Sequence, residues 1–228
     1  MTSFRENWLR KGIWLLPMYA LLTLVATLTH QPDPETEFHA WSEYVTTSTF
    51  FVSHVVGSIL ATALLILGVF ALAGRLSATR RGRTAHAAAI TTVVGTTGVL
   101  AMFGVAAFAQ PAIGQAFLSG VDAARDLHND VFDAATLAVA VPTVLLFSVG
   151  IALLGWATAA SAQVPKWASI SLGLSGPFIG ILGLALGTAQ TIGSLLLLVG
   201  GTVVARSLSS TTTEARKGAG PDDRGIGS

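Results

Sequence analysis

The sequence contains no cysteine. This absence excludes a disulfide framework, thiolate catalysis, cysteine-ligated zinc or iron–sulfur clusters, and covalent attachment of a c-type haem. Charged residues are scarce as well: they make up 11% of the 228 residues and the hydrophobic residues 52%, whereas soluble domains usually carry about 25% charged residues. A chain with so little charge is typical of a protein embedded in lipid.

The sequence also lacks the signatures of several other classes of protein. The net charge is only +1, and the basic residues lie in short loops rather than on one broad face, so we expect no nucleic-acid partner. No phosphate-binding, kinase or dinucleotide-binding motif occurs, and no lysine lies deep within an apolar run, where a retinal Schiff base would need one. We therefore predict no cofactor. No motif identifies a family.

Six apolar runs are separated by polar segments, and most are long enough to cross a hydrocarbon core of roughly 30 Å. They cover residues 13–28, 45–74, 87–109, 127–156, 167–187 and 192–205. The sequence therefore predicts an all-α fold, a polytopic integral membrane bundle of six transmembrane helices. The first run resembles a signal peptide, but it lacks a small-x-small cleavage site, and we expect it to be retained. Residues 1–206 should form one domain, and residues 207–228 a disordered cytoplasmic tail.

The charges between the spans predict the topology. If the N-terminus lies inside, Arg125 is the only one of the 13 Lys and Arg residues that falls outside. The acidic residues that fall outside or just within the outer boundary are Asp33, Glu35, Glu37, Glu43, Asp122, Asp126, Asp130 and Asp133. Under the positive-inside rule both termini are then cytoplasmic. We expect a multi-pass protein of the bacterial inner or plasma membrane.

A weak internal repeat occurs at an offset of 80 residues. Ala109-Gln110 aligns with Ala189-Gln190, and each pair ends a predicted span. Helices two and three would then correspond to helices four and five. Because each unit holds two helices, both copies would have the same orientation, which is a parallel repeat.

Polar residues within the spans gather in the predicted outer half. His54 lies in the second helix and Asp133 in the fourth, which we expect to run without a break from the polar segment beginning at Arg125. Asp126, Asp130 and Asp133 share one helical face because they are four and three residues apart. The sequence predicts an outward-facing polar pocket with Asp133 and His54 as an acid/base pair. The predicted ligand-binding residues are Asp126, His128, Asp130, Gln110 and Gln190.

Each of these residues also has a purely structural interpretation. His54 could be a neutral imidazole bonded to a backbone carbonyl or a threonine hydroxyl of the next helix. Asp133 could be solvated at the interface or paired with Arg125, and the two glutamines could cap helix ends. His39, His54, His128, Asp130 and Asp133 contain metal-ligand types, but no local metal motif groups them. A haem between His54 and His128 is disfavoured by their different depths. We assign no metal site.

Three functions remain open from the sequence. The first is a membrane protein that binds or helps to translocate a small or lipophilic molecule in the pocket. The second is an intramembrane isomerase, cyclase or hydrolase that uses Asp133 and His54 on a lipophilic substrate. The third is an accessory subunit that contacts a partner or a second copy through small residues of the fifth helix. These residues are Gly173, Gly176, Gly180 and Gly183.

Overall fold

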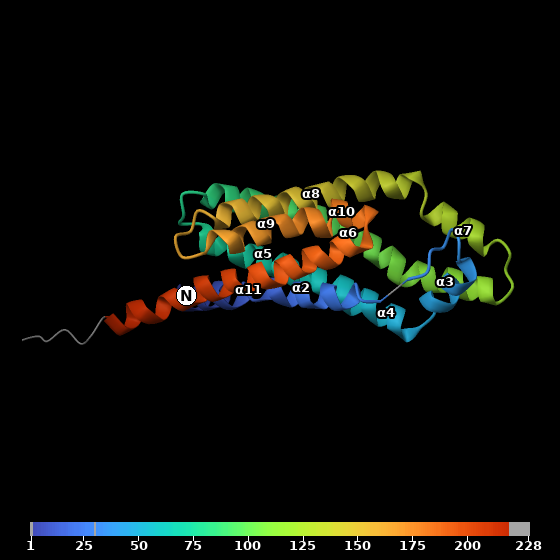
Figure 1. Ribbon diagram of the computed structural model, residues 1–228, viewed down its shortest axis with the longest axis horizontal. Helices are drawn as coiled ribbons and strands as arrows, with labels where there is room; N and C mark the ends of the chain where they lie inside the picture. Colours follow the sequence, from blue (N-terminus) through green and yellow to red (C-terminus); the bar gives the residue numbers. More distant parts are fainter. Residues whose placement is uncertain (1, 30, 219–228) are drawn as a thin grey trace, which may run out of the picture.

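The computed structural model describes residues 2–29 and 31–218. Within these ranges the chain forms helices joined by turns and contains no strand, which confirms the all-α prediction. Six helical segments are long and apolar enough to cross a membrane: Phe4–Ala26, Ser48–Leu76, Gly82–Leu118, Ala134–Thr158, Lys166–Ala185 and Gly187–Ser210. They lie alongside one another in an elongated bundle (Figure 1), which fits a multi-pass membrane protein.

Several spans consist of more than one element. The first contains α1 (Thr2–Gly12) and α2 (Leu15–Ala26), and the second contains α4 (Ser48–His54), a π-helix η1 (Val55–Leu60) and α5 (Ala61–Leu76). The third and fourth spans are α6 (Gly82–Leu118) and α8 (Ala134–Thr158). The fifth is divided into α9 (Lys166–Ile179) and α10 (Ile181–Ala185), and α11 (Gly187–Gly218) is the sixth. Two short helices, α3 (Phe38–Val45) and α7 (Ala124–Val131), lie between spans.

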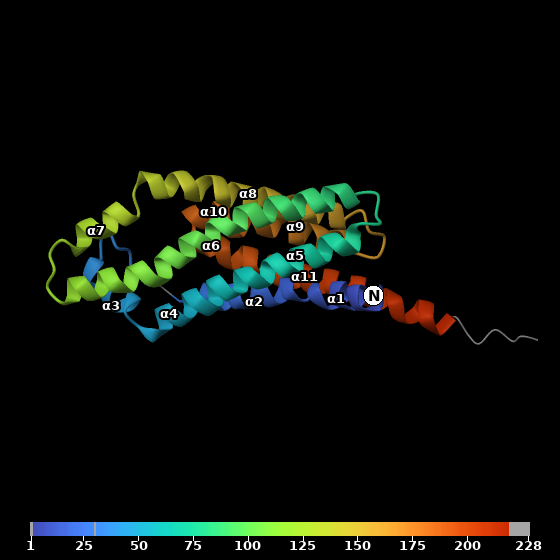
Figure 2. The same cartoon turned by 180° about the vertical axis from the view of Figure 1, so that it is seen from behind.

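Both described ends of the chain lie at the same end of the bundle. Arg75 at the end of α5 donates to the carbonyl of Leu208 in α11 at 2.8 Å, and Ser209 donates to the carbonyl of Arg10 in α1 at 3.2 Å. The loops α5–α6 and α8–α9 lie there as well, while α3 and α7 lie at the opposite end (Figures 1 and 2). We call these the basic end and the acidic end, because the first carries most of the basic residues and the second carries Asp33 to Glu43 and Asp122 to Asp133.

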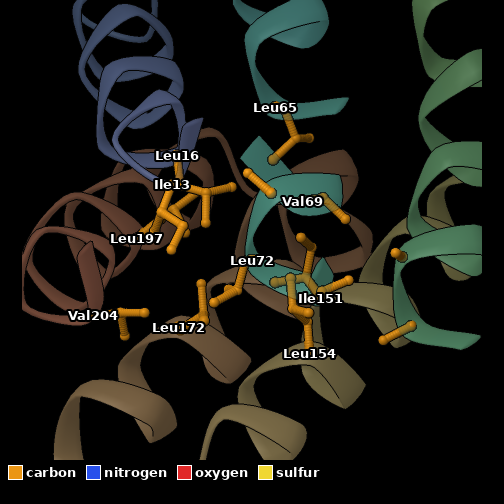
Figure 3. Close-up of a cluster of buried hydrophobic side chains, with 14 of the residues drawn as sticks. Ile13, Leu16, Leu65, Val69, Leu72, Ile151, Leu154, Leu172, Leu197 and Val204 are labelled. Carbon is orange, nitrogen blue, oxygen red and sulfur yellow. The ribbon is translucent and has the colours of Figure 1, made fainter. Parts of the chain in front are cut away.

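The half of the bundle nearer the basic end is solidly packed. A cluster of buried side chains there joins the first span to α5, α8, α9 and α11 (Figure 3). Its labelled members are Ile13, Leu16, Leu65, Val69, Leu72, Ile151, Leu154, Leu172, Leu197 and Val204. Because lipid is as apolar as leucine, helices in a membrane gain stability from close packing more than from burial itself. This half provides the rigid base of the bundle.

Glycine allows α8 to approach both of its main neighbours. A Cβ built on Gly95 of α6 would lie 2.6 Å from the carbonyl oxygen of Thr143 in α8. A Cβ on Gly155 of α8 would lie 2.5 Å from the backbone nitrogen of Gly173 in α9. Backbone cannot move aside as a side chain can, so only glycine fits at these crossings.

The glycine stripe of the fifth helix packs within the chain. Gly173 faces Gly155, Gly176 faces Ile151, and Gly180 faces Ser148, all on α8, while Gly183 faces Gln190 of α11. These four positions were expected to contact a partner or a second copy. In the structure they hold α9 and α10 against neighbouring helices, so a partner contact would need a different surface.

The acidic end carries a small cap outside the bundle. Helix α6 has 37 residues and is roughly 55 Å long at 1.5 Å per residue, well beyond the roughly 30 Å of a hydrocarbon core. Its projecting end packs on α3 and α7 through a second buried cluster: Phe38, Trp41, Val45, Phe50, Ile113 and Ala124. A Cβ on Gly114 would lie 2.7 Å from a methyl of Val45, which shows how closely α3 sits on α6.

Several boundaries differ from the sequence predictions. The third helix continues through Pro111, where we expected it to end, because its last turns pack in the cap and offset the cost of the proline. The fourth helix does not begin at residue 127: α7 ends at Val131, and α8 begins at Ala134. Helix α11 continues to Gly218, so the chain is helical over residues 207–218 of the tail expected to be disordered. Residues 219–228 of that tail lie outside the described residues.

Candidate ligand-binding cavity

A cavity of about 850 Å³ lies in the half of the bundle nearer the acidic end. All six spans contribute to its wall. Among the described residues that line it there is no Asp, Glu, Lys or Arg. Its polar groups are the imidazole of His54, the carboxamides of Gln31 and Gln190, and a set of hydroxyls from Tyr, Ser and Thr residues. The volume falls within the range of roughly 300–1,000 Å³ found for small-molecule sites.

His54 is half-buried at the wall of the cavity. Its Nδ1 lies 3.0 Å from the carbonyl oxygen of Phe50, one turn earlier in its own helix, and 3.3 Å from the hydroxyl of Ser53. A carbonyl can only accept, so the neutral ring carries its hydrogen on Nδ1 and leaves Nε2 as an acceptor. The hydrogen bond to a backbone carbonyl agrees with the structural interpretation of this histidine, although the carbonyl belongs to the same helix and not to the next one.

The second span changes from an α-helix to a π-helix immediately after His54. The π-helical turn η1 spans Val55–Leu60 and includes Gly57, which is buried against α2. A Cβ on Gly57 would lie 2.5 Å from the Cβ of Ala26. Single π-helical turns hold an extra residue and occur often at functional sites. Here the turn lets the second span contact α2 closely while Ser53, His54 and Ser58 still line the cavity.

The fifth span is broken where it forms the opposite wall. Gly180 separates α9 from α10 with φ −82° and ψ −101°. The hydroxyl of Ser148 on α8 donates to the carbonyl of Gly176 and accepts from the backbone amide of Ile181, both at 3.3 Å. Irregular backbone within a membrane requires such partners, because lipid offers none. Ser148 therefore stabilises the break at Gly180, where α9 and α10 line the cavity.

Thr96 of α6 lines the cavity and carries a buried hydroxyl. Its residue is 2% exposed, and among the described residues its Oγ1 has no hydrogen-bond partner. Its neighbours behave differently: Thr92 and Thr97 donate to carbonyls one turn earlier in α6, each at 2.8 Å. An unpaired buried hydroxyl costs free energy unless something bonds to it. Within the described part of the chain, Thr96 is thus a wall residue with an unused hydrogen-bonding hydroxyl, and Thr23 of α2 is another.

Asp133 does not line this cavity. It precedes α8 in an extended conformation, and its carboxylate accepts from the backbone amides of Ala135 at 2.9 Å and Thr136 at 3.1 Å. The side chain is exposed and is not among the cavity-lining residues. The expected convergence of Asp133 and His54 is therefore corrected: because the chain breaks before α8, the carboxylate caps the free amides of a new helix. Arg125, the alternative partner, lies over the ring of Phe38 instead.

A cap role for Asp133 makes a testable prediction. Replacing Asp133 by alanine removes both hydrogen bonds and should lower the free energy of unfolding by about 1 kcal/mol, whereas Asp133→Asn should retain most of it because asparagine also caps helices well. Reversible unfolding of the three proteins in detergent micelles would measure the difference. Equal loss of stability in both variants would contradict a capping role.

The remaining predicted residues are dispersed. Asp126 and Asp130 line a separate pocket of about 340 Å³ between α7 and the end of α6. His128 packs in the cap, with its ring 4.7 Å from the ring of Trp41, and partial burial lowers its pKa although a hydrogen bond with Asn129 raises it. Gln110 is buried, 9% exposed, and does not line the cavity. Of the predicted site residues, the cavity brings together His54 and Gln190.

No metal-binding cluster is found in the described residues, where no three His, Asp or Glu side chains come together in a way that could hold an ion. His39 pairs with Glu43 at 3.7 Å across one turn of α3, and both side chains are exposed. This contact is the solvated pair that their spacing favours.

The serine and threonine hydroxyls that line the cavity were not predicted from the sequence. Serine and threonine within apolar helices usually bond to their own backbone, and such residues are spread over all the spans, so none of them draws attention. The signal that was available is local: Ser53, His54, Gly57 and Ser58 place three polar side chains and a glycine within six positions of one span.

No protein-family model matches the chain, and neither curated proteins nor solved structures provide a significant match. The class defined by the structure is that of a multi-pass helical membrane protein with a cavity whose described lining contains no Asp, Glu, Lys or Arg.

Proposed function

We propose that the protein binds, or helps to translocate, an uncharged small or lipophilic molecule in the cavity beside His54. The observation that carries this proposal is the lining: about 850 Å³ of space, with polar groups but without a charged side chain among the described residues. An ion in so apolar an environment would need an opposite charge close by. An uncharged molecule needs only hydrogen bonds and apolar contact, which this wall supplies.

The positive-inside rule orients the proposed site. It puts the basic end and both termini in the cytoplasm and the acidic end outside. The cavity, lying in the half nearer the acidic end, would then serve the outer side of a bacterial inner or plasma membrane. The packed cluster between the cavity and the basic end argues against a continuous path and for a binding site.

Acid/base catalysis is the weaker alternative. It requires an acid and a base within hydrogen-bond reach or one water apart. The described wall of the cavity supplies His54 without a carboxylate, and the carboxylate of Asp133 is engaged by the amides of α8. An accessory role through the glycine stripe likewise lacks support, since the stripe packs within the chain.

Filling the cavity tests the proposal. Ala140 on α8 lines the cavity and is 6% exposed, while Ala138, two residues away, is exposed and is not among the lining residues. We expect Ala140→Trp to occupy the space and Ala138→Trp to project outward. The proteins would be purified in mild detergent, extracted with organic solvent, and the retained molecules quantified by mass spectrometry.

The expected result is a specific uncharged molecule retained by the wild type and by Ala138→Trp, and reduced about tenfold or more in Ala140→Trp. Melting curves would confirm that both variants fold. Equal retention by all three proteins would contradict the proposed function, and so would a charged molecule as the one that Ala140→Trp loses.

A further inference from the structure

The proposed function leaves open how the cavity is reached and what its occupant is, and the structure bears on both. We infer that the cavity opens sideways into the outer leaflet, between α2 and the corner where α10 meets α11. We further infer that it takes an uncharged lipid with a hydroxyl head group, such as a long-chain alcohol. This inference rests on the proposed function and specifies its ligand.

The opening arises because α2 and α11 diverge. Near the basic end they are in contact, where Gly201 of α11 faces Leu16 and Pro17 of the first span. Toward the acidic end each turns to a different neighbour: Ala26 of α2 meets Gly57 of η1, whereas Gly193 of α11 meets Ile179 of α9. The divergence is visible in Figure 1, where α11 rises toward α10 while α2 does not.

Three exposed leucines flank this opening. Leu28 follows α2, and Leu184 and Leu186 form the α10–α11 corner; all three line the cavity. They are nevertheless 72%, 57% and 59% exposed, respectively. Exposed leucines on a membrane bundle face hydrocarbon without cost, whereas a mouth open to water would leave this apolar area hydrated. The wall of the cavity thus continues onto the lipid-facing surface.

The polar interior selects the head group. Nε2 of His54 is an acceptor, because Nδ1 is engaged by the carbonyl of Phe50. The buried hydroxyl of Thr96 lacks a partner among the described residues. A hydroxyl both donates and accepts, so it can satisfy either group, and it carries no charge that would need an ionic partner. The hydrocarbon chain of such a lipid would extend toward Leu28 and Leu186.

Photolabelling tests this inference. The protein would be reconstituted in phosphatidylcholine vesicles with hexadecanol that bears a diazirine close to its hydroxyl group. Probes with the same chain and a carboxylate or a quaternary ammonium head serve as comparison. Peptide mass spectrometry would give the ratio of label on the cavity wall at Val99 and Met102 to label on the lipid-facing residues Leu137 and Val139.

We expect the alcohol to label the cavity wall preferentially and the charged probes to label the lipid-facing surface alone. Thr96→Val should reduce the labelling ratio of the alcohol about fivefold, the effect of one lost hydrogen bond. Thr97→Val is the matched control and should leave the ratio unchanged, because that hydroxyl is exposed and bonded to its own helix.

Failure of this inference can be distinguished from failure of the proposed function. If the wild type retains a molecule that Ala140→Trp loses, but hexadecanol does not label the cavity wall, the binding site stands and the lipid-facing entry is overturned. Equal labelling by the three probes, or equal effects of Thr96→Val and Thr97→Val, would overturn the hydroxyl head group. If the cavity-filling variant retains what the wild type retains, both proposals fail.

Discussion

Replacing Gly155 by alanine is expected to destabilise the bundle by about 3 kcal/mol, at the upper end of the usual cost of overpacking. A Cβ at this position would lie 2.5 Å from the backbone nitrogen of Gly173 and 2.6 Å from the carbonyl oxygen of Ser169. Both are backbone atoms of α9, so the two helices would have to separate. Loss of this contact would also move the α9–α10 wall of the cavity. Unfolding by SDS titration in mixed micelles would measure the effect.

Gly104→Ala on α6 is the matched control. Nothing lies within 4 Å of a Cβ built at this position, and alanine is favoured over glycine in a helix by up to about 1 kcal/mol. We therefore expect this variant to be as stable as the wild type or slightly more stable. Similar stability of the Gly155→Ala and Gly104→Ala proteins would contradict the close crossing of α8 and α9.

Ser148→Ala is expected to cost about 1–3 kcal/mol, although it removes a single oxygen atom. The hydroxyl partners two backbone groups at the break in the fifth span, the carbonyl of Gly176 and the amide of Ile181. Ser148 is 4% exposed. The carbonyl of Gly176 keeps the amide of Gly180 as a partner at 2.8 Å, but the amide of Ile181 loses its partner, and a buried group left unpaired costs about 1–3 kcal/mol. Hydrogen exchange should accelerate at Ile181 and the residues of α10. Exchange measured by mass spectrometry, together with unfolding titrations, would detect both effects.

Ser175→Ala provides the comparison. Ser175 is also buried, but its hydroxyl donates to the carbonyl of Leu172 within its own helix. Because such carbonyls also accept helical hydrogen bonds, its loss should cost less than about 1 kcal/mol. If Ser175→Ala were as destabilising as Ser148→Ala, or if exchange in α10 did not change, Ser148 would not be the group that supports the broken helix.

The six spans could be predicted because the bilayer fixes the length and composition of a crossing helix. The interruptions within these spans depend on contacts between residues that are distant in the sequence. The break at Gly180 requires Ser148, 32 residues earlier, and the π-helical turn after His54 accompanies the contact of Gly57 with Ala26. Neither contact can be read from hydropathy.

The start of α8 is different, because its signal is local. Asp133 precedes Ala134, Ala135 and Thr136, and an aspartate in that position is a strong helix N-cap. We expected a continuous helix because the polar residues before it share a helical face. That face exists in α7, but it belongs to a separate helix in the cap, which is why Asp126 and Asp130 lie apart from His54.

Residues of the candidate site could be predicted where a strongly polar side chain, which is rare in an apolar span, lies far from the loops. His54 is the histidine placed well inside an apolar run, and Gln190, which we expected at the end of the fifth span, lies near the start of α11; both line the cavity. Thr96 could not be singled out, because Thr92 and Thr97 look equivalent in the sequence and differ from it only in their hydrogen bonds. The internal repeat and the orientation across the membrane stay predictions.

A density map of the protein in lipid nanodiscs would test the central claim most directly. We predict elongated density in the cavity that reaches His54 and Thr96, extends toward the opening at Leu28 and Leu186, and disappears in Ala140→Trp. A cavity closed by its own side chains, or a carboxylate of this chain beside the imidazole of His54, would contradict it.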